Sequence, residues 1–143
     1  MPVRTASAEW KGTLAKGSGV MKMESGAYEG AFSVPSRFEN GNGTNPEELI
    51  AAAHAGCFSM ALTAGLTRGG FQVDTVNTSA AVHIDKGDDG WSITKIHLTC
   101  EAKVGEIDDA AFQEQASAAK AGCPVSKALS GGPTITLEAK LVS

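Results

Sequence analysis

The sequence is poor in cysteine. Its 143 residues include only Cys57, Cys100 and Cys123, and no two of them form a Cys-x-x-Cys pair. Disulfide scaffolds of small secreted domains need more cysteines at closer spacing. A structural zinc site normally has at least one close ligand pair, and here only His54, three residues before Cys57, supplies one. We therefore expect inert buried thiols or a redox pair, with a metal held by His54 and Cys57 as the weaker alternative.

Positive charge is also scarce: the sequence has 12 Lys and Arg and 16 Asp and Glu, which gives a formal net charge of −4. Without a basic field the chain does not attract phosphate backbones or anionic headgroups, so we expect no nucleic acid and no membrane as partner. The longest apolar stretch, 49–66, consists largely of Ala and Gly and predicts a buried helix. Residues 1–10 contain no secretory signal pattern, which makes the cytoplasm the expected compartment.

Several catalytic signatures are missing. The glycine pairs within 17–19 and 41–43 lack the remaining residues of a phosphate-binding loop. The Gly-x-Ser-x-Gly elbow of serine hydrolases and the His-Glu-x-x-His helix of zinc proteases do not occur either. These absences argue against nucleotide chemistry, serine hydrolysis and zinc proteolysis, and we expect neither a bound cofactor nor a metal.

The order of the predicted elements indicates the fold class. Alternating apolar residues and glycine-rich turns predict strands over 5–12, about 19–25, 28–34, 73–85, 91–104 and 135–141. Capping signals and glycine stops predict helices over 46–68, about 109–121 and 124–129. In the strand 91–104, alternation places Cys100 on the apolar face, as a packed and inert thiol. The pattern predicts a single α+β domain, 1–143, with antiparallel sheet.

The long helix has the clearest start in the sequence. Asn45 can cap it, Pro46 suits its first position, and Glu48 stands where a capping box wants a carboxylate. Residues 36–43 before it are expected to form a polar loop. Because apolar and small residues lie on nearly every side of this helix, one sheet can cover only part of it. We therefore predict a homodimer in which the uncovered face packs on a second copy of the chain.

The two thiols outside the strand have different expected surroundings. An apolar helix centre raises the pKa of Cys57, so a reactive Cys57 would need a cation or donor from His54 or Arg37. Cys123 stands between Gly122 and Pro124, at an expected helix N-terminus whose partial positive charge favours a thiolate. These arguments alone make Cys123 the better nucleophile.

Four segments together carry a resemblance to a known family. They are Arg37-Phe38-Glu39, residues 43–49, residues 52–62 with Cys57, and residues 120–126 with Cys123. Over essentially the whole chain the sequence resembles the OsmC (osmotically inducible protein C) family, which is related to the organic hydroperoxide resistance (Ohr) proteins. The place of Arg37, just before the long helix, is similar to the OsmC branch. The resemblance implies antiparallel sheets packed around a long central helix in an intertwined homodimer.

The resemblance also implies a chemistry. It implies a thiol-dependent peroxidase, active in oxidative or osmotic stress, that reduces organic hydroperoxides, and more weakly hydrogen peroxide, to alcohols. Cys57 would become a sulfenic acid, which Cys123 would resolve as a disulfide. Arg37 and Glu47 would hold Cys57 as a thiolate. An external dithiol, by family analogy a lipoylated protein, would reset the pair. These roles reverse those that the helix-terminus argument gave.

The spacing of Glu47 and Cys57 raises a further expectation. Ten positions on a continuous helix amount to about 15 Å of rise, too far for a shared hydrogen bond. The Arg37 and Glu47 that serve one Cys57 are therefore expected from the partner chain, unless the helix breaks near Gly56. Two rival classes stay open. A non-enzymatic stress or ligand-binding protein would tolerate Cys57→Ala, and a metal-binding protein would lose its metal when His54 and Cys57 are both changed.

Overall fold

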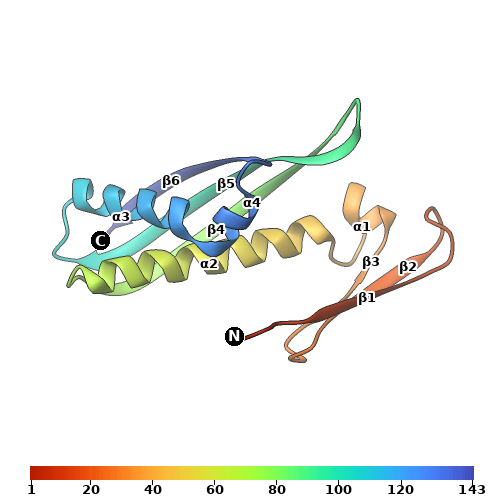
Figure 1. Ribbon diagram of the computed structural model, residues 1–143, viewed down its shortest axis with the longest axis horizontal. Helices are drawn as coiled ribbons and strands as arrows, with labels where there is room; N and C mark the ends of the chain where they lie inside the picture. The colour runs from red at the N-terminus through yellow and green to blue at the C-terminus, as the bar shows by residue number, and fades with distance from the viewer. The chain divides into compact units, whose positions relative to one another are not determined.

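The computed structural model describes residues 1–143, which divide into two compact units, Met1–Leu49 and Ile50–Ser143. Each unit has a three-stranded sheet of its own, and the element order is the predicted one with one helix added (Figure 1). The α+β class is confirmed.

The first unit is an antiparallel meander of β1 (Ala6–Lys11), β2 (Ser18–Met23) and β3 (Glu29–Phe32). The three short predicted strands are confirmed, each ending somewhat earlier than expected. The register depends on a missing side chain at Gly19, where a Cβ would lie 2.6 Å from the Glu9 carbonyl oxygen and from the Phe32 ring. The Phe32 ring instead packs on Trp10, with ring centroids 5.4 Å apart.

The expected loop 36–43 is partly wrong, because a short helix, α1 (Val34–Phe38), covers its first residues. Ser33 and Ser36 cap this helix reciprocally, since each backbone N–H donates to the other's hydroxyl, at 2.8 and 3.3 Å. A helix this short shows no periodicity, and serine pairs are also common in turns, so the sequence pattern did not reveal it. Arg37 therefore lies on a helix.

The sheet of the second unit is a long antiparallel hairpin, β4 (Gln72–Gly87) and β5 (Gly90–Gly105), with β6 (Thr134–Val142) beside β5. The predicted strands are confirmed, but β6 runs parallel to β5, which departs from the antiparallel expectation. A parallel neighbour needs a long crossover, and α3 (Asp109–Gly122) and α4 (Pro124–Leu129) supply it. Asp108 caps α3, through a 2.7 Å hydrogen bond from Ala111 N–H.

Helix α2 (Pro46–Arg68) has the predicted ends and runs without a break. Asn45 Oδ1 accepts a 2.7 Å hydrogen bond from Glu48 N–H, so Asn45 caps the helix as expected. The Glu48 carboxylate accepts from the Thr44 hydroxyl at 2.8 Å, and the predicted capping box does not form. Because the helix continues through Gly56, the alternative of a break there is wrong.

The core of the second unit forms where α2, β5 and α3 meet. From His54 to Leu66 every fourth residue of α2 is fully buried, as is every second residue of β5 from Ile96 to Ala102, which confirms the packed Cys100. The core consists of Phe58, Leu62, Leu66, Ile96, Leu98, Cys100, Ala102, Phe112, Ala116 and Ala119. Figure 1 shows α2 and α3 running lengthwise along the hairpin. Although α2 is long and apolar enough to cross a membrane, its buried stripe is part of this protein core.

Within one chain the fully buried residues of α2 lie on this stripe, which agrees with the expectation that a single chain covers only part of the helix. Met60 on another face is 76% exposed. The small residues Ala52, Ala53, Gly56 and Ala64 are exposed as well.

The α2 stripe should dominate the stability of the second unit. Leu62→Ala leaves a cavity in a fully buried position and is expected to lower the free energy of unfolding by about 2–5 kcal/mol. Leu14→Ala, at a side chain 74% exposed, should change it by less than about 0.5 kcal/mol. Urea titrations at equal protein concentration compare the two variants. Equal midpoints would contradict this account of the core.

Candidate thiol active site

The second unit brings Cys57 and Cys123 together. Cys57 lies half-buried at the centre of α2, whereas Cys123 is fully buried at the junction of α3 and α4. Cys123 ends α3 through a 2.9 Å bond from its N–H to the Ala119 carbonyl, and it also caps the N-terminus of α4. Both thiols are free, and they lie close enough together for each to shift the pKa of the other.

Opposite pKa shifts distinguish the two thiols. Burial would raise the pKa of Cys123, but the thiolate form is stabilised by hydrogen bonds from the Ser126 hydroxyl, from backbone N–H groups and from Cys57, which outweigh burial and lower this pKa. The Ser126 N–H lies 3.4 Å from Cys123 Sγ. Burial raises the pKa of Cys57, and the neighbouring Cys123 raises it further, against a hydrogen bond from the Val125 backbone that lowers it. In the single chain, thiolate character therefore belongs to Cys123, as the helix-terminus argument expects.

His54 is fully buried on the α2 stripe and contacts a residue that the sequence did not single out. Its Nε2 lies 2.7 Å from the Ser126 hydroxyl, which in turn accepts from the Cys123 thiol at 3.3 Å. His54 was a candidate partner for Cys57, but the structure connects it to Cys123. The signal for Ser126 was its place three residues after a cysteine that starts a helix. No cluster of three or more His, Cys, Asp or Glu residues occurs, so His54 and Cys57 gain no third metal ligand.

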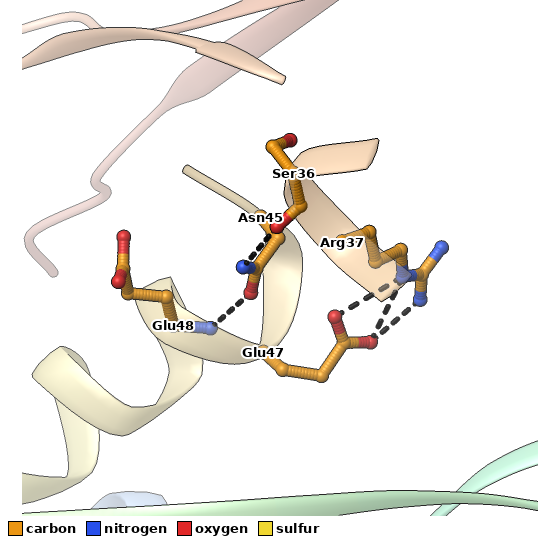
Figure 2. Close-up of polar contacts among 5 residues, drawn as sticks. All are labelled: Ser36, Arg37, Asn45, Glu47 and Glu48. Carbon is orange, nitrogen blue, oxygen red and sulfur yellow. Dashed lines mark hydrogen bonds and ion pairs between the residues drawn. The ribbon is translucent and has the colours of Figure 1, made fainter. Parts of the chain in front are cut away.

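Arg37 and Glu47 form an ion pair within the first unit (Figure 2). The Arg37 guanidinium holds the Glu47 carboxylate in two places, Nη2 to Oε1 at 2.6 Å and Nε to Oε2 at 3.1 Å. Asn45 fastens α1 to the start of α2 by donating to the Ser36 carbonyl at 3.0 Å. Glu47 is 9% exposed and Arg37 38% exposed, so the pair keeps one solvent-facing cation. The structure thus joins these two predicted site residues to each other.

A free thiol on a long helix, close to a second free thiol that caps another helix, is an arrangement suited to thiol redox chemistry in a protein of α+β fold. The family model described as OsmC-like protein matches residues 39–138. The chain belongs to the OsmC family. It is 44% identical to peroxiredoxin OsmC of Escherichia coli (strain K12) over 138 residues, 96% of each chain.

Related solved structures have the same fold. The chain is 30% identical to the organic hydroperoxide resistance protein OhrB of Bacillus subtilis over 125 residues, 86% of this chain and 90% of OhrB. The OhrB crystal structure superposes with a TM-score of 0.71, at 28% identity over 95% of this chain and 98% of that one. A crystal structure of an organic hydroperoxide resistance protein OsmC from Legionella pneumophila superposes with a TM-score of 0.75, at 21% identity over 98% of this chain and 99% of that one.

The order in which the thiols ionise follows from these pKa shifts. In a Cys57→Ser variant, the ultraviolet absorbance of thiolate should rise in two steps as pH increases, with Cys123 first. The Cys100 step comes later because burial raises the pKa of Cys100, against a weaker lowering by the Thr78 hydroxyl. The matched variant Cys57→Ser/Cys123→Ser should lose the earlier step and keep the later one. Loss of the later step instead would mean that the shifts are assigned to the wrong thiols.

Proposed function

We propose that Cys57 and Cys123 are the peroxidatic and resolving thiols of this chain. The chain is a hydroperoxide-reducing peroxidase of the OsmC family that acts in the response to oxidative stress. The names of its relatives, peroxiredoxin OsmC and organic hydroperoxide resistance protein, support that activity and organic hydroperoxides as substrates. The observation that carries the residue assignment is the proximity of the two free thiols, each of which shifts the pKa of the other, because a disulfide requires its two sulfurs to come together.

The reaction then has two chemical steps in the protein. The Cys57 thiolate attacks one peroxide oxygen, the O–O bond breaks, and the alkoxide leaves as an alcohol after taking a proton. Cys57 is left as a sulfenic acid. The Cys123 thiolate attacks the Cys57 sulfur, releases hydroxide and forms the disulfide. An external dithiol, which we propose to be a lipoyl group on a protein, reduces the disulfide; hydrogen peroxide is the poorer substrate.

The opposite pKa shifts suit this division of roles. A thiol of lowered pKa is ready to act as nucleophile, as the resolving step requires of Cys123. The pKa of Cys57 is raised by burial and by Cys123, so Cys57 needs a cation before it can attack a peroxide. The guanidinium of Arg37, oriented by Glu47, is the cation that we propose for this task.

We further infer that this cation comes from a second copy of the chain. Helix α2 is unbroken, so the ten positions from Glu47 to Cys57 amount to about 15 Å of rise. The exposed apolar face of α2 around Gly56 and Met60 is suited to pack against the α2 of a partner, because small residues let two helices approach closely. In the proposed homodimer, Arg37 of the partner subunit activates each Cys57.

Cysteine substitutions test the residue assignment. With cumene hydroperoxide and a dithiol reductant, Cys57→Ser should abolish turnover, and Cys123→Ser should stop at the Cys57 sulfenic acid without an internal disulfide. Cys100→Ala is the matched control and should keep wild-type turnover, because the mechanism does not use that buried thiol. Peroxide consumption and non-reducing mass analysis measure both properties. Activity that survives Cys57→Ser but not Cys123→Ser would reverse the roles, and an inactive wild type would favour the ligand-binding alternative.

Subunit mixing tests the origin of the cation. Arg37→Ala should lower kcat/KM by about 100-fold or more, as loss of a preorganised electrostatic group does, while Arg4→Ala, at an exposed arginine of the same unit, should have no effect. When Arg37→Ala and Cys57→Ser chains are co-expressed, half of the randomly assorted dimers are mixed, and each mixed dimer holds one intact site. About a quarter of wild-type activity should then return. No recovery in purified mixed dimers would place Arg37 and Cys57 of one site on the same chain.

A further inference from the structure

A buried polar chain of three side chains connects Cys123 to His54. Cys123 and His54 are fully buried and Ser126 is 4% exposed. The Cys123 sulfur lies 3.3 Å from the Ser126 hydroxyl, which lies 2.7 Å from His54 Nε2. Buried polar groups are costly unless they are paired, so three such groups in series, from α2 and from the start of α4, require an explanation beyond packing.

The two hydrogen bonds among these three side chains point the same way. A serine hydroxyl has one hydrogen, so when the Cys123 thiol donates to Ser126, the Ser126 hydrogen must go to His54 Nε2. Nε2 is then the acceptor, and the proton of the neutral ring is on Nδ1, a buried atom with no hydrogen-bond partner. Reversing both bonds turns the same chain into a donor to the Cys123 thiolate. The three groups can therefore pass a proton between Cys123 and the imidazole.

We propose that His54, acting through Ser126, takes the proton of Cys123 when Cys123 attacks the Cys57 sulfenic acid, and returns it to the departing hydroxide. This inference rests on the proposed peroxidase function. It makes His54 and Ser126 positioning residues for the second chemical step, because both act through Cys123.

The step balances. The Cys123 sulfur uses an electron pair to form the S–S bond while the S–O bond of the Cys57 sulfenic acid breaks, so Cys123 is oxidised and Cys57 is reduced. The Cys123 proton moves to Ser126 as the Ser126 proton moves to Nε2. Nε2 then returns a proton to Ser126 while the Ser126 hydroxyl gives its own proton to the leaving hydroxide, which departs as water. The net reaction is one thiol and one sulfenic acid giving one disulfide and one water.

The surroundings of His54 suit a group that takes a proton and gives it back. Burial lowers the pKa of His54, so the resting imidazole is neutral with its Nε2 lone pair available, and the protonated ring readily returns its proton. Among titratable groups, Cys57 on α2 is the one that shifts the pKa of Cys123, and no charged side chain of the helices or the sheet does so. The backbone N–H of Ser126 is a separate donor to Cys123, and side-chain variants retain it.

A disulfide-exchange experiment isolates the attack by Cys123 without any peroxide. The reagent DTNB should react first with the half-buried Cys57, and the buried Cys123 should then displace the second thionitrobenzoate. In His54→Gln, which keeps a hydrogen bond but cannot carry a proton, the first release should be unchanged. The second should slow by about 100-fold at pH 7, the scale of general acid–base effects, and recover by about tenfold per pH unit toward alkaline pH.

Matched variants control for structure. Ser126→Ala should reproduce the effect of His54→Gln, Ser126→Thr should restore the fast second release because it keeps the hydroxyl, and His83→Gln, at an exposed histidine of β4, should behave as wild type. Circular dichroism and melting curves establish that each variant is folded. If His54→Gln does not fold, the comparison of Ser126→Ala with Ser126→Thr decides.

Three outcomes separate this inference from the proposed function. A second release that is as fast in folded His54→Gln or Ser126→Ala as in wild type, at every pH, overturns the relay even if the chain reduces cumene hydroperoxide. A uniformly slow release that high pH does not restore also overturns it, since it indicates a structural effect. A His54-dependent, pH-restored release in a chain that does not reduce cumene hydroperoxide supports the relay and refutes the peroxidase assignment.

Discussion

The buried stripe of α2 is the constraint on which the thiol site depends. Positions 54, 58, 62 and 66 follow one another at four-residue spacing on a single face, and all four are fully buried. Three are apolar and pack on β5 and α3, whereas the first is His54. Because apolar packing fixes the rotation of α2 about its own axis, it also places His54 in contact with Ser126 and Cys57 next to Cys123.

The junction of α3 and α4 supplies the other half of the site. One residue, Cys123, ends the first helix and caps the second, so its sulfur receives the hydrogen bond that an N-cap side chain normally accepts. That geometry stabilises a thiolate inside a core where burial alone would suppress it. Cys100 shows the contrast, because it is equally buried but has no such cap, and its pKa is raised. Location relative to a helix end thus separates a thiol of lowered pKa from one of raised pKa.

The two units divide the proposed chemistry between a cation and a thiol pair. The first unit aligns Arg37 through Glu47, and short hydrogen bonds around Ser36 and Asn45 fix the helix start that carries this carboxylate. The second unit holds the sulfurs. If the cation comes from a second copy, an isolated chain of this peroxidase is inactive. The proposed dimer would then explain both the exposed apolar face of α2, which packs on the partner, and the raised pKa of Cys57, which lacks its cation in the single chain.

The sequence by itself determined the strands, the ends of α2, the inward face of β5 and the two thiol motifs, because alternation, caps and glycine stops are local signals. It did not reveal α1, whose serine caps resemble a turn, or the parallel pairing of β6, which depends on where α3 and α4 return the chain. Tertiary structure decided the link from His54 through Ser126 to Cys123. His54 and Ser126 are 72 positions apart in the sequence, and only the packing of α2 against the following helices brings them within hydrogen-bond distance.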